Sequence, residues 1–182
     1  FKTLGLAEGW PVYTSALGPT KSLKLNTTAS PTTTTSMFQD TAPSTTIFSV
    51  GANSANKATP MIAYCFADVQ GFSKVGGSYE GNADVDGTFV YTGFRPEFVI
   101  CRTTSGGTWW MFDNKREGYN VNNDPLVAED TTVEATTDMI DLLSNGFKMR
   151  IATDPNKSEP YLYMAFAESP FVNSNGVPTN AR

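Results

Sequence analysis

The 182-residue chain contains no histidine, two cysteines and few charged residues, which make up 17% of the sequence. Without histidine there is no Ser-His-Asp or Cys-His nucleophile system and no histidine-ligated metal site. The sequence also has no glycine-rich phosphate-binding loop and no nucleophile-elbow motif. These absences remove common routes to catalysis, so we expect a protein that is not an enzyme and that holds no cofactor.

Basic residues are too few and too scattered to indicate a nucleic-acid partner. The 13 lysines and arginines form no run, and the net charge is −5, whereas binding to a phosphate backbone needs clustered cations. No apolar stretch approaches the roughly 18 residues that span a bilayer. We therefore expect neither nucleic-acid binding nor membrane insertion.

The residues that are abundant predict an all-β protein. Hydrophobic residues make up 40% and aromatic residues 12% of the chain. Runs of alternating, β-branched and aromatic residues are separated by Gly, Asn, Pro and Asp clusters, the pattern of strands joined by turns. The predicted strands are 10–15, 22–26, 46–50, 61–67, 71–79, 88–91, 97–103, 109–113, 146–151 and 161–167. A short helix or irregular loop is predicted at 133–143, and an exposed Thr/Ser/Pro loop at 27–36.

Both cysteines lie in apolar runs. Cys65 follows Met61-Ile62-Ala63-Tyr64, and Cys101 follows Phe98-Val99-Ile100. We interpret both as small core residues of strands, with a disulfide between them as the alternative.

Three blocks recur at an offset of about 100 residues, which indicates a duplication. The paired blocks are Trp10–Tyr13 with Trp109–Phe112, Phe48–Val50 with Phe147–Met149, and Ala63–Asp68 with Tyr163–Glu168. The predicted segments are 1–68 as the C-terminal part of a first antiparallel β-sandwich repeat, 69–171 as a second repeat, and 172–182 as a C-terminal tail. A first copy without its opening strands is expected to need upstream sequence or a neighbouring subunit to cover the apolar face around 61–66.

The pair Trp109-Trp110 is the first candidate for binding. Adjacent strand residues point to opposite faces of a sheet, and Trp109 aligns with Trp10 in the duplication. We therefore predict that Trp10 and Trp109 are buried and that Trp110 is more exposed. An exposed Trp stacks on a sugar ring or anchors a protein interface, while packing in the core or at a subunit interface is the alternative. Tyr119 is a second aromatic candidate.

Asp84 and Asp86 form the other candidate group, in Asn82-Ala83-Asp84-Val85-Asp86-Gly87. The simplest interpretation is a polar hairpin turn in which Asn and Asp side chains bind nearby backbone N–H groups. A ligand-binding calcium loop or a catalytic carboxylate pair are the alternatives, although the cluster lacks the ligand count of an EF-hand loop.

A series of strings, most of them in the second copy, carries a family resemblance. They are Ala63–Ala67, Gly71–Lys74, Ser78–Asn82, Asp86–Pro96, Leu143–Lys148, Tyr163–Glu168 and Pro178–Arg182. Phe89–Pro96, which reads Phe-Val-Tyr-Thr-Gly-Phe-Arg-Pro, is fairly specific. The sequence resembles a repeat of structural proteins from tailed phages, marine phages especially, found near the C-terminal end of tail-fibre-like polypeptides.

The resemblance implies a virion component with a jelly-roll or lectin-like fold and assigns no catalytic residue. The expected function is a tail fibre or surface appendage on the extracellular particle. Expected partners are other virion proteins, further copies of this chain, in a trimer as in tail fibres, and a glycan on the host surface. The alternatives are a capsid-decoration or head-fibre protein, and a carbohydrate-binding β-sandwich module.

Overall fold

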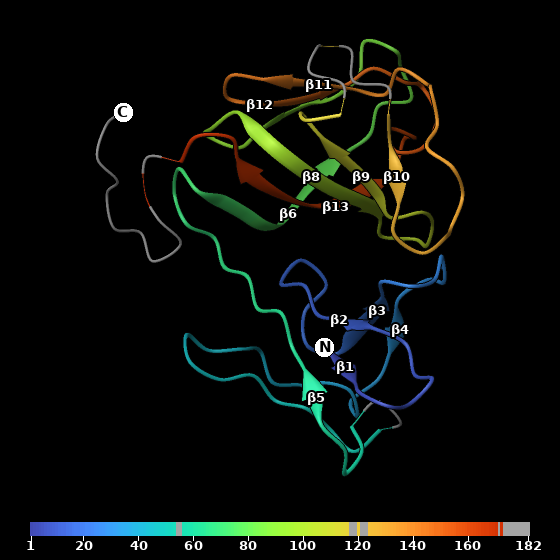
Figure 1. The fold of residues 1–182 in the computed structure, drawn as a ribbon, viewed down its shortest axis with the longest axis vertical. Helices are drawn as coiled ribbons and strands as arrows, with labels where there is room; N and C mark the ends of the chain where they lie inside the picture. Colours follow the sequence, from blue (N-terminus) through green and yellow to red (C-terminus); the bar gives the residue numbers. More distant parts are fainter. Residues whose placement is uncertain (54–55, 117–119, 121–123, 171, 173–182) are drawn as a thin grey trace.

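The computed structural model describes residues 1–53, 56–116, 120, 124–170 and 172 (Figure 1). Across these residues the fold is all-β: the strands pair only in antiparallel ladders, and there is no helix. Accordingly, none of these residues belongs to a helix that could span a membrane.

Two sheets form the body of the protein, drawn in green to red in Figure 1. The five-stranded sheet has the order β10 (Leu126–Val127), β9 (Trp110–Asp113), β8 (Pro96–Thr103), β13 (Pro160–Ala167) and β6 (Ser73–Glu80). The three-stranded sheet has the order β11 (Ile140–Leu143), β12 (Gly146–Met149) and β7 (Phe89–Tyr91). A two-residue turn, Ser144-Asn145, joins β11 to β12 and fixes their register.

The two sheets share one core. Phe147 of β12 is fully buried and makes edge-on ring contacts with Tyr79 of β6, at 5.9 Å between centroids, and with Tyr163 of β13, at 5.3 Å. In β8, Val99 and Cys101 point into this core, whereas Ile100 belongs to a second cluster on the opposite face. Strand alternation therefore divides the residues of β8 between two apolar layers.

The N-terminal segment covers that opposite face of the five-stranded sheet. It contributes β1 (Lys2–Thr3), β2 (Pro11–Val12), β3 (Lys21–Lys24), β4 (Thr32–Thr33) and β5 (Met61–Ile62), which form one three-stranded and one two-stranded sheet. Leu23 of β3 is 1% exposed and clusters with Ile100, Trp109 and Leu162. The central strands of the five-stranded sheet, β8 and β13, are thus covered on both faces.

Arg102 of β8 fastens the N-terminal segment to the sheet. Its side chain is fully buried, and its two terminal nitrogens donate to the carbonyl oxygens of Lys24, at 3.3 Å, and Ala29. The guanidinium also lies over the Trp109 ring, 5.0 Å from its centroid. Burial lowers the pKa of Arg102, while Glu129 and Asp154 favour its charged form.

The strand predictions are largely confirmed for residues after 71 and less so before. Residues 133–143 form no helix: β11 occupies 140–143, and the residues before it have no regular structure. The strand predicted at 46–50 is absent, because Ser44 and Ile47 form a turn there and Ile47 is 70% exposed. The strand predicted at 61–67 is limited to Met61–Ile62.

The duplication is not confirmed. Phe48 is 39% exposed and lies outside any strand, whereas its counterpart Phe147 is fully buried in β12. The two phenylalanines therefore occupy unrelated environments, although the sequence blocks around them are alike.

The cysteines also differ from each other. Cys101 is buried in β8, as predicted, and burial raises the pKa of its thiol to about 12. The prediction that Cys65 is a core residue in a strand is wrong: Cys65 is exposed, in a segment without strand pairing. Both thiols are free, so the disulfide alternative is not realised.

Candidate functional site

The two adjacent tryptophans point to opposite faces of the five-stranded sheet. Trp109 is 7% exposed and donates from Nε1 to the carbonyl oxygen of Lys24, at 2.9 Å. Trp110 is half-buried and packs on the core between the sheets. The prediction that Trp110 is more exposed than Trp109 is therefore confirmed. Trp10, predicted to be buried, is only half-buried and stacks on Tyr64, at 6.2 Å between ring centroids.

The indole of Trp110 is held in place by a buried hydrogen-bond network. Its Nε1 donates to Oδ2 of Asp154, at 2.8 Å, and the hydroxyl of Tyr161 donates to Oδ1 of the same carboxylate, at 2.9 Å. Tyr161 is fully buried, and this burial raises the pKa of its hydroxyl, which therefore stays protonated and donating. The ring is thus fixed by one charge-assisted hydrogen bond to a carboxylate that Tyr161 in turn orients, and a ring held in this way loses little conformational freedom when a ligand binds.

Trp110 lies in an open groove of about 470 Å³. The other lining residues are hydroxyl-bearing (Thr27, Thr28, Thr108, Thr132), acidic (Glu129, Asp130) and apolar (Pro125, Val127, Val133, Ala135). They come from three parts of the chain: the loop after β3, the start of β9, and β10 with the loop that follows it. We name these residues the Trp110 groove.

Ion pairs and hydrogen bonds anchor the acidic wall of the Trp110 groove. Glu129 accepts the backbone N–H of Trp109, at 3.0 Å. Arg116 pairs with Asp113 at the end of β9, at 2.7 Å, and with Glu134 in the loop. Hydrogen bonds from the Thr132 hydroxyl and the Thr131 N–H lower the pKa of Asp130. The wall is therefore a fixed, negatively charged set of hydrogen-bond acceptors.

Asp84 and Asp86 form the polar turn that the sequence indicates. The N–H of Asp84 donates to Oδ1 of Asn82, at 3.1 Å, and the N–H of Asp86 donates to Oδ1 of Asp84, at 2.8 Å. Asp86 also pairs with Lys148. These side-chain bonds account for both aspartates without a ligand, and neither residue lines the Trp110 groove. Tyr119 lies outside the described residues.

Asn156 pins this turn to the rest of the fold. It is fully buried, and its Nδ2 lies 2.8 Å from Oδ1 of Asn82, 2.9 Å from the carbonyl oxygen of Asp84 and 2.8 Å from that of Ile151.

No cluster of three or more acidic or cysteine side chains suited to a metal ion occurs in the part of the chain that the structure describes.

Sequence reasoning selected Trp110 but missed the residues around it. Asp154 is a lone acid before Pro155, and no local pattern connects it with a tryptophan 44 residues away. Thr27 and Thr28 lie in the loop predicted only to be exposed. Glu129 and Asp130 belong to no motif that sets them apart from other acidic residues of the sequence.

Comparison with known proteins places the chain in a family. No curated protein and no solved structure matches it. A family model described as a domain of unknown function, DUF7483, matches residues 1–170. Because that match covers nearly the whole chain, the protein belongs to the DUF7483 family.

Proposed function

We propose that this protein is a non-enzymatic surface component of a tailed-phage virion, a tail fibre or similar appendage, that binds neutral glycans in the Trp110 groove. The observation that carries the glycan part is the fixed indole of Trp110 in an open groove with hydroxyl and carboxylate side chains. The phage part is supported by the resemblance of strings such as Phe89–Pro96.

The chemistry of the Trp110 groove suits a pyranose ring. Such a ring has an apolar C–H face, which stacks on an indole, and a rim of hydroxyl groups that need hydrogen-bond partners. Threonine hydroxyls donate and accept, and the carboxylates of Glu129 and Asp130 accept from sugar hydroxyls. Two fixed negative charges disfavour acidic sugars by like-charge repulsion, so the proposed ligand class is neutral.

The fold is consistent with this role. Two antiparallel sheets with one shared core support the proposal of a lectin-like β-sandwich. In this arrangement the Trp110 groove lies at the start of β9, with loops on both sides of it. Loops on a rigid sheet scaffold are the usual location of binding residues.

Replacing Trp110 by alanine is expected to weaken neutral-glycan binding at least ~30-fold, because a central aromatic contact is worth about 2 kcal/mol. The measurement is a glycan array with the wild-type chain, followed by calorimetric titration of the best neutral glycan into both proteins. Trp10→Ala is the matched control, since Trp10 is a half-buried tryptophan outside the groove, and it should bind like the wild type. An array without neutral-glycan signal, or equal binding by the Trp110→Ala variant and the wild-type protein, would contradict the proposal.

A further inference from the structure

An extended segment between β5 and β6 has exposed side chains and an unused backbone. Six consecutive residues, 63–68, are exposed, and Figure 1 shows this connection running from the N-terminal sheets to the body. Within the described part of the chain, the backbone groups of residues 63–66 neither donate nor accept a hydrogen bond. Unpaired extended backbone is a template for another strand. We name residues 63–67 the strap.

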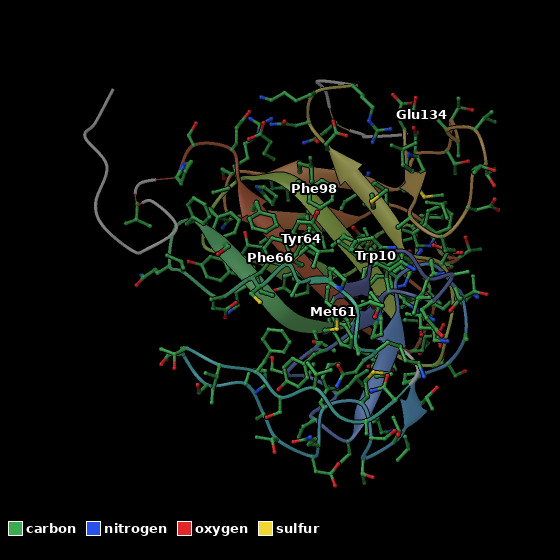
Figure 2. The ribbon with its side chains drawn as sticks, turned by 60° about the horizontal axis from the view of Figure 1, so that its bottom comes forward. Trp10, Met61, Tyr64, Phe66, Phe98 and Glu134 are labelled. Carbon is green, nitrogen blue, oxygen red and sulfur yellow. The ribbon has the colours of Figure 1, made fainter. Side chains whose placement is uncertain are left out.

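Aromatic rings lie along the strap. Tyr64 is 63% exposed although it stacks on Trp10, and Phe66 is 53% exposed although it contacts Phe166, at 5.6 Å between centroids. Figure 2 shows Trp10, Tyr64 and Phe66 close together, and Glu134 well apart from them. The strap is thus a surface separate from the Trp110 groove, with apolar side chains next to free N–H and C=O groups.

The residue types of the strap follow the same order whether the segment is read from its N-terminal or its C-terminal end. Its sequence is Ala63-Tyr64-Cys65-Phe66-Ala67, small–aromatic–cysteine–aromatic–small. When such a segment pairs antiparallel with a copy of itself, Cys65 lies opposite Cys65 and each Tyr64 lies opposite a Phe66. Aromatic cross-strand pairs stabilise a two-stranded ladder, and a surface that complements itself is what a two-fold interface requires.

We propose that the strap pairs antiparallel with the strap of a second copy of this chain, about a two-fold axis at Cys65. The pairing gives partners to the N–H and C=O groups on the edge of the strap that faces the second copy, and it places the aromatic rings of the two copies side by side. It differs from the three-fold assembly that the resemblance to tail fibres implies, because a segment paired with itself relates two chains.

The area of this contact indicates a weak dimer. With roughly 200 Å² per aromatic side chain, the exposed fractions of Tyr64 and Phe66 leave roughly 450 Å² of ring surface over two copies. Stable interfaces bury about 1,200 Å² or more, so the strap backbone and its neighbours must supply the rest. We expect a concentration-dependent equilibrium between monomer and dimer.

Two double variants test the register. In Tyr64→Lys with Phe66→Lys, the opposed positions carry like charges, so sedimentation velocity over a concentration series should show only monomer. In Tyr64→Lys with Phe66→Glu, each Lys faces a Glu of the second copy, so dimer should persist. Both variants lose the same ring contacts within the chain, and thermal unfolding checks that both fold.

Cross-linking of Cys65 gives an independent readout. A short bis-maleimide should link two wild-type chains through Cys65, and Cys65→Ser should abolish the linked band. Cys101 is an internal control, because its buried thiol has a raised pKa and should not react in the folded protein. A wild-type chain that is monomeric at every concentration or trimeric, or equal dimerisation of the two double variants, would overturn the proposal.

Discussion

Replacing Arg102 by alanine is expected to lower the free energy of unfolding by about 3–4 kcal/mol. The side chain is the largest among those that are fully buried. Its removal leaves a cavity, breaks the bonds to the carbonyl oxygens of Lys24 and Ala29, and removes the cation–π contact with Trp109. Chemical denaturation followed by circular dichroism measures the loss.

Two further variants separate the causes. Arg102→Met keeps most of the packing but not the hydrogen bonds, so its loss should be smaller than that of the alanine variant. Arg95→Ala is the control on the surface, because Arg95 is half-exposed and pairs with Glu168, at 3.2 Å, and it should change stability by less than about 1 kcal/mol. A stability of Arg102→Ala within 1 kcal/mol of the wild type would mean that this side chain does not fasten the N-terminal segment.

Replacing Asn156 by aspartate is expected to destabilise the protein by about 4 kcal/mol at neutral pH, without any change in side-chain volume. The new carboxylate would face Oδ1 of Asn82 and the carbonyl oxygens of Asp84 and Ile151, where the wild-type amide donates. An ionised buried carboxylate opposite three acceptors keeps one weak donor, the N–H of Asn82 at 3.3 Å, which compensates for little of its lost hydration. Unfolding free energies measured across a pH series give the result.

The deficit of the Asn156→Asp variant should depend on pH in a defined direction. Burial among acceptors raises the pKa of the introduced carboxyl above its unfolded value of about 3.9. The deficit should therefore be smallest below pH ~4, grow as the pH rises through the folded-state pKa, and then stay constant. Asn156→Ala is the matched control, because it deletes the amide without adding a titrating group, and its deficit relative to the wild type should not vary with pH.

The second half of the fold was the more predictable half from the sequence. In the second half, strand pairing produces clear alternation: Tyr161, Tyr163 and Ala165 of β13 all point into the core. The same signal is present at 140–143, within the segment predicted as a helix or loop, where Ile140 and Leu142 are buried with a period of two. Period-two burial is the mark of a strand.

The first half could not be read in the same way, because its larger apolar cluster is completed by residues of the five-stranded sheet, and only a small group around Phe38 packs within the segment itself. Leu23 packs against Ile100 and Leu162, and Lys24 is joined to Arg102, 78 positions along the chain. Those partners are remote in sequence, so local patterns predicted strands that are shortened or absent. The similarity of the blocks Phe48–Val50 and Phe147–Met149 likewise did not indicate which of the two phenylalanines is buried and which is exposed.

The candidate site was predictable only in its central residue. Alternation between Trp109 and Trp110 correctly separated a buried ring from a half-buried one. Asp154 and the threonines of the Trp110 groove meet Trp110 only through tertiary packing, which brings the loop after β3 next to β9. Sequence patterns show which residue types are available for binding, but not which of them share a groove.

The central claim is that this chain acts by binding at the surface of a phage particle. This proposal is tested most directly by gold labelling, in electron microscopy, of intact phage particles proposed to carry the chain, with antibodies raised against the exposed loop 40–47. We expect labels at regular positions on a tail appendage of the intact particle. Particles that carry no label before or after disruption, with the chain recovered only from the soluble fraction of the lysate, would contradict it.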